Sequence, residues 1–247
     1  MNGLLAALRF LTVLPLPGDS GSRAEDLPAS LPFFPVVGLI LGAGAAVLAF
    51  YGSVLVPPAP LSVLIVGYLA FMSRGLHLDG LADTADGLMG SHQRQRMLEI
   101  MRDSRVGAMG VIAVFCVLAV KGASLASCER HALWRAALIL PVAGRSAVVM
   151  AMGLLPYARP EGAGTAFYQD RPCAAAIFAV LLALATGWLV AESAGLVAVE
   201  AALVVTMLLC WFAYRRIGGA TGDVLGAVCE IAEATAALAA CAWWFSV

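Results

Sequence analysis

Long apolar runs, separated by short polar or proline-containing segments, constrain the fold of this 247-residue chain more than any other feature. A helix needs about 20 apolar residues to cross the hydrocarbon core of a bilayer. The runs that approach or reach this length are residues 31–56, 61–73, 106–126, 134–155, 174–191, 196–214 and 224–245. The sequence therefore predicts an all-α, polytopic membrane protein with about seven transmembrane helices in a single integral membrane domain, residues 1–247.

Composition supports this class, because 62% of the residues are hydrophobic, 13% are charged and the mean hydropathy is +0.91. Soluble domains carry about twice that share of charged residues. The net charge is −1 and the sequence has no run of basic residues, which argues against a nucleic-acid partner. The predicted surroundings are instead the lipid bilayer. The six cysteines have no CxxC spacing, so we interpret them as small core residues.

The arginines indicate the orientation in the membrane. They collect before the first run and in alternate loops: Arg9, Arg23, Arg74, Arg94, Arg96, Arg102, Arg105, Arg159, Arg171, Arg215 and Arg216. On the opposite side we count little more than Lys121 and Arg130. The positive-inside rule then predicts a cytoplasmic N-terminus and a C-terminus outside. Residues 1–30 are expected to be cytoplasmic or interfacial, because the apolar run 4–16 is too short to span.

The segment 74–105, expected on the cytoplasmic side, contains three aligned carboxylates. Asp79, Asp83 and Asp86 follow the spacing i, i+4 and i+7, which places them on one face of a helix. Like charges at this spacing repel one another, so a cation is expected among them, and oxygen ligands favour Mg²⁺, Mn²⁺ or Ca²⁺ over zinc. The alternative is a solvated helix end. His77 is a candidate base or supporting donor, or a structural histidine.

A second polar cluster precedes the run 106–126. Arg102, Asp103, Ser104 and Arg105 stand where a helix is expected to begin. A helix N-terminus flanked by arginines can hold a phosphate group. The alternative is that these arginines only anchor the span at the lipid headgroups.

A third cluster precedes the last apolar run. Four glycines between 218 and 226 allow the backbone to approach a ligand or another helix closely, and Gly219, Thr221 and Asp223 lie among them. Asp223 and Glu230 share a face at the spacing i and i+7. We interpret this segment as part of the same site.

Some charged residues fall inside apolar runs, among them Glu230, Glu233 and Arg145. Glu230 and Glu233 need a wet cavity, a partner charge or a proton, because an intramembrane carboxylate is costly. Arg145 is a candidate partner for one of them or for a phosphate. A buried ion pair with no chemical role is the alternative interpretation.

Carboxylate-bound Mg²⁺ together with arginines suits a diphosphate, which favours phosphoryl transfer to a membrane-associated alcohol. An ion-coupled transporter is a second interpretation, because transporters also use intramembrane carboxylates. It is disfavoured by the predicted crowding of polar clusters on one side and by the lack of a visible internal repeat.

The chain resembles the cobalamin synthase family (adenosylcobinamide-GDP ribazoletransferase) over nearly its whole length. The matching segments are residues 9–12 with Pro15, 31–38, 75–87, 102–108 and 217–227. Arg74 stands where many relatives have a second glycine. CDP-alcohol phosphotransferases are an enzymatic alternative, but their DGxxAR run is absent, because Asp83 follows Asp79-Gly80-Leu81-Ala82.

The resemblance implies a late step of cobalamin biosynthesis that requires Mg²⁺. Adenosylcobinamide-GDP and α-ribazole, or its 5′-phosphate, would give adenosylcobalamin, or its 5′-phosphate, and GMP. We expect a site that faces the cytoplasm in the bacterial inner membrane, with other enzymes of nucleotide-loop assembly as partners. The metal would be held by Asp79, Asp83 and Asp86, with Asp223 or Asp103 completing the shell or taking the hydroxyl proton. The candidate substrate contacts are Arg102, Ser104, Arg105, Arg145, Gly219, Thr221, Asp223 and Glu230.

Overall fold

The computed structural model describes residues 2–19, 21–159, 164–168 and 172–246, and these ranges contain helices and no strand. The α-helices are α1 (Asn2–Leu11), α2 (Phe34–Leu55), α3 (Pro58–Met72), α4 (Leu76–Gly90), α5 (Arg94–Ile100), α6 (Ala108–Ser127), α7 (Arg130–Leu154), α8 (Cys173–Ile217) and α9 (Gly222–Ser246). Short 3₁₀ turns are η1 (Ala24–Asp26), η2 (Pro28–Phe33) and η3 (Thr165–Tyr168). The predicted all-α class is confirmed.

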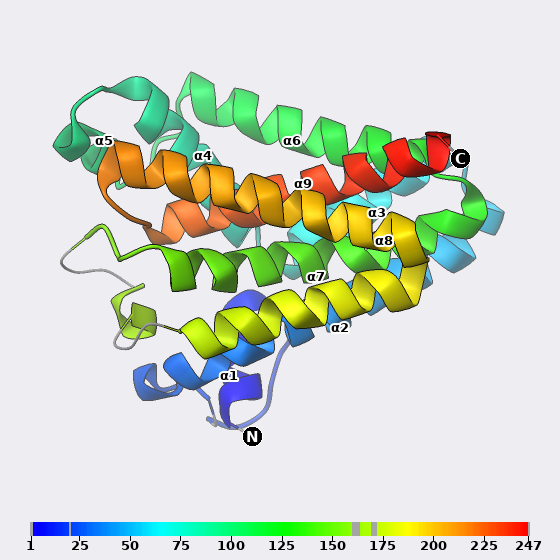
Figure 1. Cartoon of the computed structure of the whole chain (residues 1–247), viewed down its shortest axis with the longest axis horizontal. Helices are drawn as coiled ribbons and strands as arrows, with labels where there is room; N and C mark the ends of the chain where they lie inside the picture. The colour runs from blue at the N-terminus through cyan, green and yellow to red at the C-terminus, as the bar shows by residue number, and fades with distance from the viewer. Residues whose placement is uncertain (1, 20, 160–163, 169–171, 247) are drawn as a thin grey trace.

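The helices form a bundle around α7 and α9, which are the most deeply buried of the long helices (Figure 1). Helices α2 and α8 pack against α7, and α4 and α6 pack against α9. Gly38 and Gly42 of α2 bring its backbone against the carbonyl groups of Pro141 and Leu138 in α7, where any side chain would collide. Helices inside membranes commonly associate through such small residues, because close backbone approach maximises van der Waals contact.

Among the described residues, five helical segments are long and apolar enough to cross a membrane: Pro28–Leu55, Ala108–Ser127, Arg130–Leu154, Cys173–Ile217 and Gly222–Ser246. Helices α3 and α4, bent by 90° at their junction, can count together as a sixth. The chain is thus a polytopic helical membrane protein, whereas the predicted number of seven spans is not confirmed.

Helix α8 is broken where the sequence shows a gap between two apolar runs. Ala191 and Glu192 have non-helical backbone angles, and Glu192 has a positive φ of 48°. The chain reverses there, so that the second arm of α8 returns toward the end of the bundle at which the first arm began (Figure 1). Gly187 and Gly195 face each other across the turn with no room for a side chain.

The junction of α3 and α4 sets the direction of α4. Arg74 and Gly75 both adopt left-handed backbone angles, with φ of 55° and 65°. Left-handed angles are unusual for a residue with a side chain, so Arg74 carries local strain. Its guanidinium donates hydrogen bonds to the carbonyls of Arg9 (3.0 Å) and Phe10 (3.1 Å) at the end of α1. The glycine-like turn is therefore tied to the N-terminal helix.

The polar segments gather at one end of the bundle. Figure 1 shows the α4–α5 connection, the start of α6, the end of α7 and the α8–α9 turn together, with the C-terminus at the other end. The expected clustering on one side is therefore found. Arg171, which we expected on this side, lies outside the described residues.

Lys121 was expected among the few charges of the opposite side, and this was wrong. It lies inside α6 with 3% of its surface exposed. Its Nζ is 2.5 Å from Oε2 of Glu230 and 2.6 Å from Oε2 of Glu233, and Arg145 of α7 pairs with Glu233. We call these four residues the buried ion cluster. A buried charge has to be paired with an opposite charge. The four residues of this cluster come from three different helices, so counting charges along the sequence does not reveal the pairing.

Replacing Lys121 with methionine should destabilise the protein by about 3–5 kcal/mol, because it leaves buried carboxylate charge uncompensated. Unfolding of detergent-solubilised protein measures the change. The matched control is the double variant Lys121→Met, Glu230→Gln, which removes one charge of each sign and should recover part of the loss. Equal stability of the wild type and the single variant would contradict this role.

Candidate active site

Helices α4 and α9 touch at two glycines. A Cβ atom on Gly80 would lie 2.8 Å from the carbonyl oxygen of Asp223, and one on Gly226 would lie 3.0 Å from that of His77. The first distance is shorter than real Cβ contacts and the second is tighter than most of them, so both helices need small residues here and Gly80 leaves no room for a side chain. This contact places the acidic face of α4 beside the first turn of α9.

Four carboxylates come together at this contact. Asp79, Asp83 and Asp86 lie on α4, and Asp223 lies in the first turn of α9. Asp83 is within electrostatic reach of the other three and of Arg159. We call Asp79, Asp83, Asp86 and Asp223 the acidic face.

Asp86 also has a structural role. Its Oδ2 accepts a hydrogen bond from the backbone N–H of Gly107 (2.6 Å), and its Oδ1 accepts one from Gly110 (2.9 Å). These N–H groups lie at the start of α6, so the carboxylate caps this helix and favours the positive end of its dipole. Side chains at either glycine would collide with the carboxylate. The α6 N-terminus, which the sequence suggested for phosphate, is therefore occupied by Asp86.

Asp223 is held by Arg159, which the sequence alone does not assign to the site. Arg159 Nη2 donates to Oδ2 of Asp223 at 2.9 Å, and the hydroxyl of Thr221 donates to the same oxygen at 3.2 Å. The sequence signal for Arg159 was only its place directly after a span on the arginine-rich side. Its partner is 64 positions away in the chain.

The turn before α9 is fixed by backbone pairing with the end of α7. Ala158 N–H donates to Ala220 O at 2.8 Å, and Ala220 N–H donates to Pro156 O at 2.9 Å. Gly219 is buried against Pro156, and Thr221, with no exposed surface, accepts a hydrogen bond from the Val224 N–H. In this conformation Gly219 and Thr221 therefore position Asp223 and Arg159.

The segment between α5 and α6 is exposed. Arg105 forms an ion pair with Asp103, with 2.6 Å between Nη2 and Oδ2, and its hydrogen bonds lower the pKa of Asp103 to about 2. Arg102 and Ser104 are exposed on the same segment. Exposed ion pairs contribute little to stability, so Arg105 can exchange Asp103 for another anion at small cost.

The remaining predicted site residues lie away from the acidic face. Arg145 and Glu230 belong to the buried ion cluster. His77 is 4% exposed, and its Nδ1 has no hydrogen-bond partner among the described residues. The electrostatic neighbours of this histidine include Arg145, Glu233 and Lys121, so it borders the buried ion cluster.

The donor atoms of the acidic face suit a hard cation. Within the described ranges, the side chains of Asp79 and Asp83 form no hydrogen bond or ion pair, which leaves their oxygens available. Oxygen-only sets of this kind favour Mg²⁺. However, the same part of the chain contains no group of three or more Asp, Glu, His or Cys side chains already arranged around a metal position. Binding would therefore require rotation of these side chains.

Comparison with known proteins identifies the family. The sequence model of cobalamin-5-phosphate synthase matches residues 3–241. The chain belongs to the cobalamin-5-phosphate synthase family. This match covers every element that builds the acidic face. No solved structure matches the chain.

Curated members of the family are similar over most of their length. A protein of Roseiflexus sp. (strain RS-1) is 41% identical over 93% of this chain and 85% of its own length. A relative from Acetivibrio thermocellus is 37% identical over 94% of this chain and 94% of its own length. A relative from Chlorobaculum tepidum is 38% identical over 98% of this chain and 96% of its own length. All three are named adenosylcobinamide-GDP ribazoletransferase.

Two glycines of α6 test the contact between Asp86 and this helix. Gly110→Ala should destabilise the protein by about 1–3 kcal/mol, because the new Cβ would press on Asp86 and on the Ala82 carbonyl. Gly122→Ala, where an added Cβ meets nothing within 4 Å, should stabilise it by about 0.5–1 kcal/mol. Unfolding in detergent measures both, and equal effects at the two positions would refute the contact.

Proposed function

We propose that this protein is an adenosylcobinamide-GDP ribazoletransferase, which joins adenosylcobinamide-GDP to α-ribazole or α-ribazole 5′-phosphate and releases GMP. The observation that carries the proposal is the acidic face, built from α4 and α9 by a chain of the cobalamin-5-phosphate synthase family. The family relatives described above carry this name over nearly the same length of sequence.

The proposed reaction is a phosphoryl transfer. A ribose hydroxyl of ribazole attacks the phosphorus attached to cobinamide, a new P–O bond forms, and the P–O bond to GMP breaks. Charge accumulates on the phosphoryl and leaving oxygens, so catalysis depends on positioning and on positive charge near the diphosphate. A carboxylate of the acidic face accepts the hydroxyl proton.

Mg²⁺ is the proposed cofactor, with Asp79 and Asp83 as the ligands most free to turn toward it and Asp223 as a further ligand. When bound, it neutralises diphosphate oxygens and stabilises the developing charge. Asp86 keeps α4 in register with α6 through its two backbone hydrogen bonds. Arg159 holds Asp223 in place and adds a cation to the site.

The arginines of the α5–α6 segment are proposed to contact the phosphates. Arg105 and Arg102 are exposed near the start of α6, next to the glycine that binds Asp86. A guanidinium group forms strong paired hydrogen bonds with phosphate oxygens. The Arg105–Asp103 ion pair would open when the diphosphate arrives.

We further propose a multi-pass protein of the bacterial inner membrane with the acidic face toward the cytoplasm. The support is the collection of arginines at the end of the bundle that carries this face. Adenosylcobinamide-GDP and GMP would then be exchanged with the cytoplasm, where other enzymes of nucleotide-loop assembly are proposed partners.

Asp83→Asn should lower GMP release by at least about 10²-fold, as expected when a metal ligand or charge-stabilising group is lost. The assay uses purified protein in nanodiscs with adenosylcobinamide-GDP and α-ribazole 5′-phosphate. Asp26→Asn, on η1, is the matched control and should retain wild-type turnover. Undiminished turnover by a folded Asp83→Asn protein would move the metal site away from this carboxylate.

Removing divalent metal should abolish turnover, and adding Mg²⁺ should restore it. The measurement is GMP release after treatment with EDTA and after titration with Mg²⁺ or Ca²⁺. We expect Ca²⁺ to restore less activity, because its longer and less regular coordination does not reproduce the compact Mg²⁺ geometry. Full activity in EDTA would refute the proposed cofactor.

A further inference from the structure

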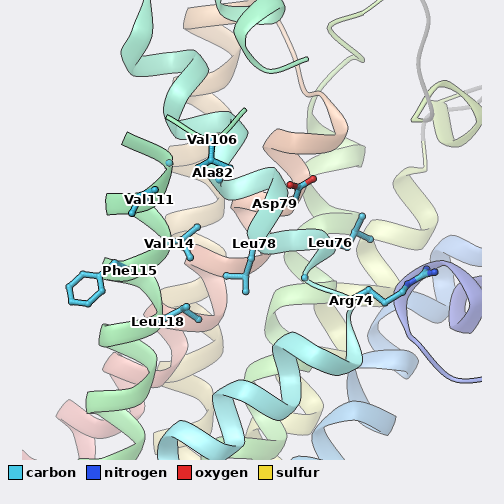
Figure 2. A pocket seen from close by; sticks show the side chains of 12 residues that line it. Arg74, Leu76, Leu78, Asp79, Ala82, Val106, Val111, Val114, Phe115 and Leu118 are labelled. Carbon is cyan, nitrogen blue, oxygen red and sulfur yellow. The ribbon is translucent and has the colours of Figure 1, made fainter. Parts of the chain in front are cut away.

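An apolar groove borders the acidic face. It lies between α4 and α6 near the α3–α4 turn and has a volume of about 780 Å³. Figure 2 shows Arg74 and Asp79 on one side of the groove and Val111, Val114 and Leu118 of α6 on the other. A volume of this size is within the range of about 300–1,000 Å³ that holds small organic ligands. None of the substrate groups placed at the acidic face above occupies this groove.

The groove contains few polar groups. Arg74 and Asp79 are the only charged residues that line it in the described structure. Figure 2 shows the Arg74 side chain extending away from the α6 wall, and the guanidinium binds the end of α1. Asp79 belongs both to the groove and to the acidic face. A ligand in the groove therefore reaches the acidic face at Asp79.

We propose that this groove binds the aromatic base of ribazole, with the attached ribose directed toward Asp79. This inference rests on the proposed function and names the subsite for one of its two substrates. The base is a flat, uncharged benzimidazole with apolar edges and one acceptor nitrogen. It can bury its ring against Val111, Val114 and Leu118 without leaving donors unpaired.

Other parts of the substrates fit the groove less well. Guanine presents several donors and acceptors along its edges, and burying them without partners costs free energy. The corrin ring of cobinamide carries amide side chains around its rim, which have the same difficulty on apolar walls. A lipid acyl chain matches the walls, but it has no group for Asp79.

The position of the ribose follows from the shared residue. With the base between α4 and α6, the ribose hydroxyls lie at the end of the groove where Asp79 meets the acidic face. This is where the attacking hydroxyl has to be in the proposed reaction. The groove thus binds ribazole next to the carboxylates, over which the diphosphate binds.

The test compares two neighbouring positions on α6. Val111 lines the groove and is 57% exposed, whereas Ile112 is 52% exposed and does not line it. Val111→Trp should fill the groove and raise the KM for α-ribazole at least tenfold, while kcat and the KM for adenosylcobinamide-GDP stay close to wild type. Ile112→Trp should change none of these values. A rise in KM alone is the signature of lost ground-state binding.

Binding of α-ribazole alone to protein in nanodiscs, measured by equilibrium dialysis, gives a readout that does not need turnover. We expect Val111→Trp to weaken this binding and Ile112→Trp to leave it unchanged, and Val114→Phe provides a second groove variant if Val111→Trp does not fold. If folded groove variants leave α-ribazole binding unchanged, or raise only the KM for adenosylcobinamide-GDP, the inference is overturned. Wild-type protein that binds α-ribazole in the groove but releases no GMP would instead refute the proposed function.

Discussion

The pairing of buried charge in the buried ion cluster is the interaction on which the rest of the structure depends. Lys121, Arg145, Glu230 and Glu233 bring equal numbers of positive and negative charges from α6, α7 and α9 into contact. A membrane interior offers no water to stabilise an isolated charge, so these helices can associate only in the register that joins all four. This cluster also weakens the transporter interpretation, because Glu230 and Glu233, the glutamates inside α9, already have cationic partners.

Helix α4 is then placed by three contacts that are close to the polar end of the bundle. Glycines remove the space between α4 and α9, Asp86 joins α4 to α6, and Arg74 joins the α3–α4 turn to α1. None of these contacts requires an apolar side chain on the outer face of α4. The carboxylates on that face can therefore stay at the surface. The acidic face is therefore rigid in its backbone, whereas Asp79 and Asp83 keep side-chain freedom.

The sequence predicted the features that arise from local spacing. Helical periodicity was enough to align Asp79, Asp83 and Asp86, and the polar gap near Glu192 marked the break in α8. The partners of Lys121 are at least 109 positions away in the chain, and the partner of Arg159 is 64 positions away. A single sequence contains no information on such distant pairs. The capping role of Asp86 was missed for the same reason, because it depends on how two helices pack.

The hydrogen bonds from α6 to Asp86 have a consequence for how an anion is received. The first turn of α6 has backbone N–H groups of the kind that bind phosphate at a helix N-terminus. In this protein the Asp86 carboxylate binds these N–H groups, and its negative charge offsets the attraction that the helix end would otherwise exert on a phosphate. A diphosphate that approached the acidic face would therefore meet repulsion unless a cation came with it or the exposed arginines of the α5–α6 segment moved toward it.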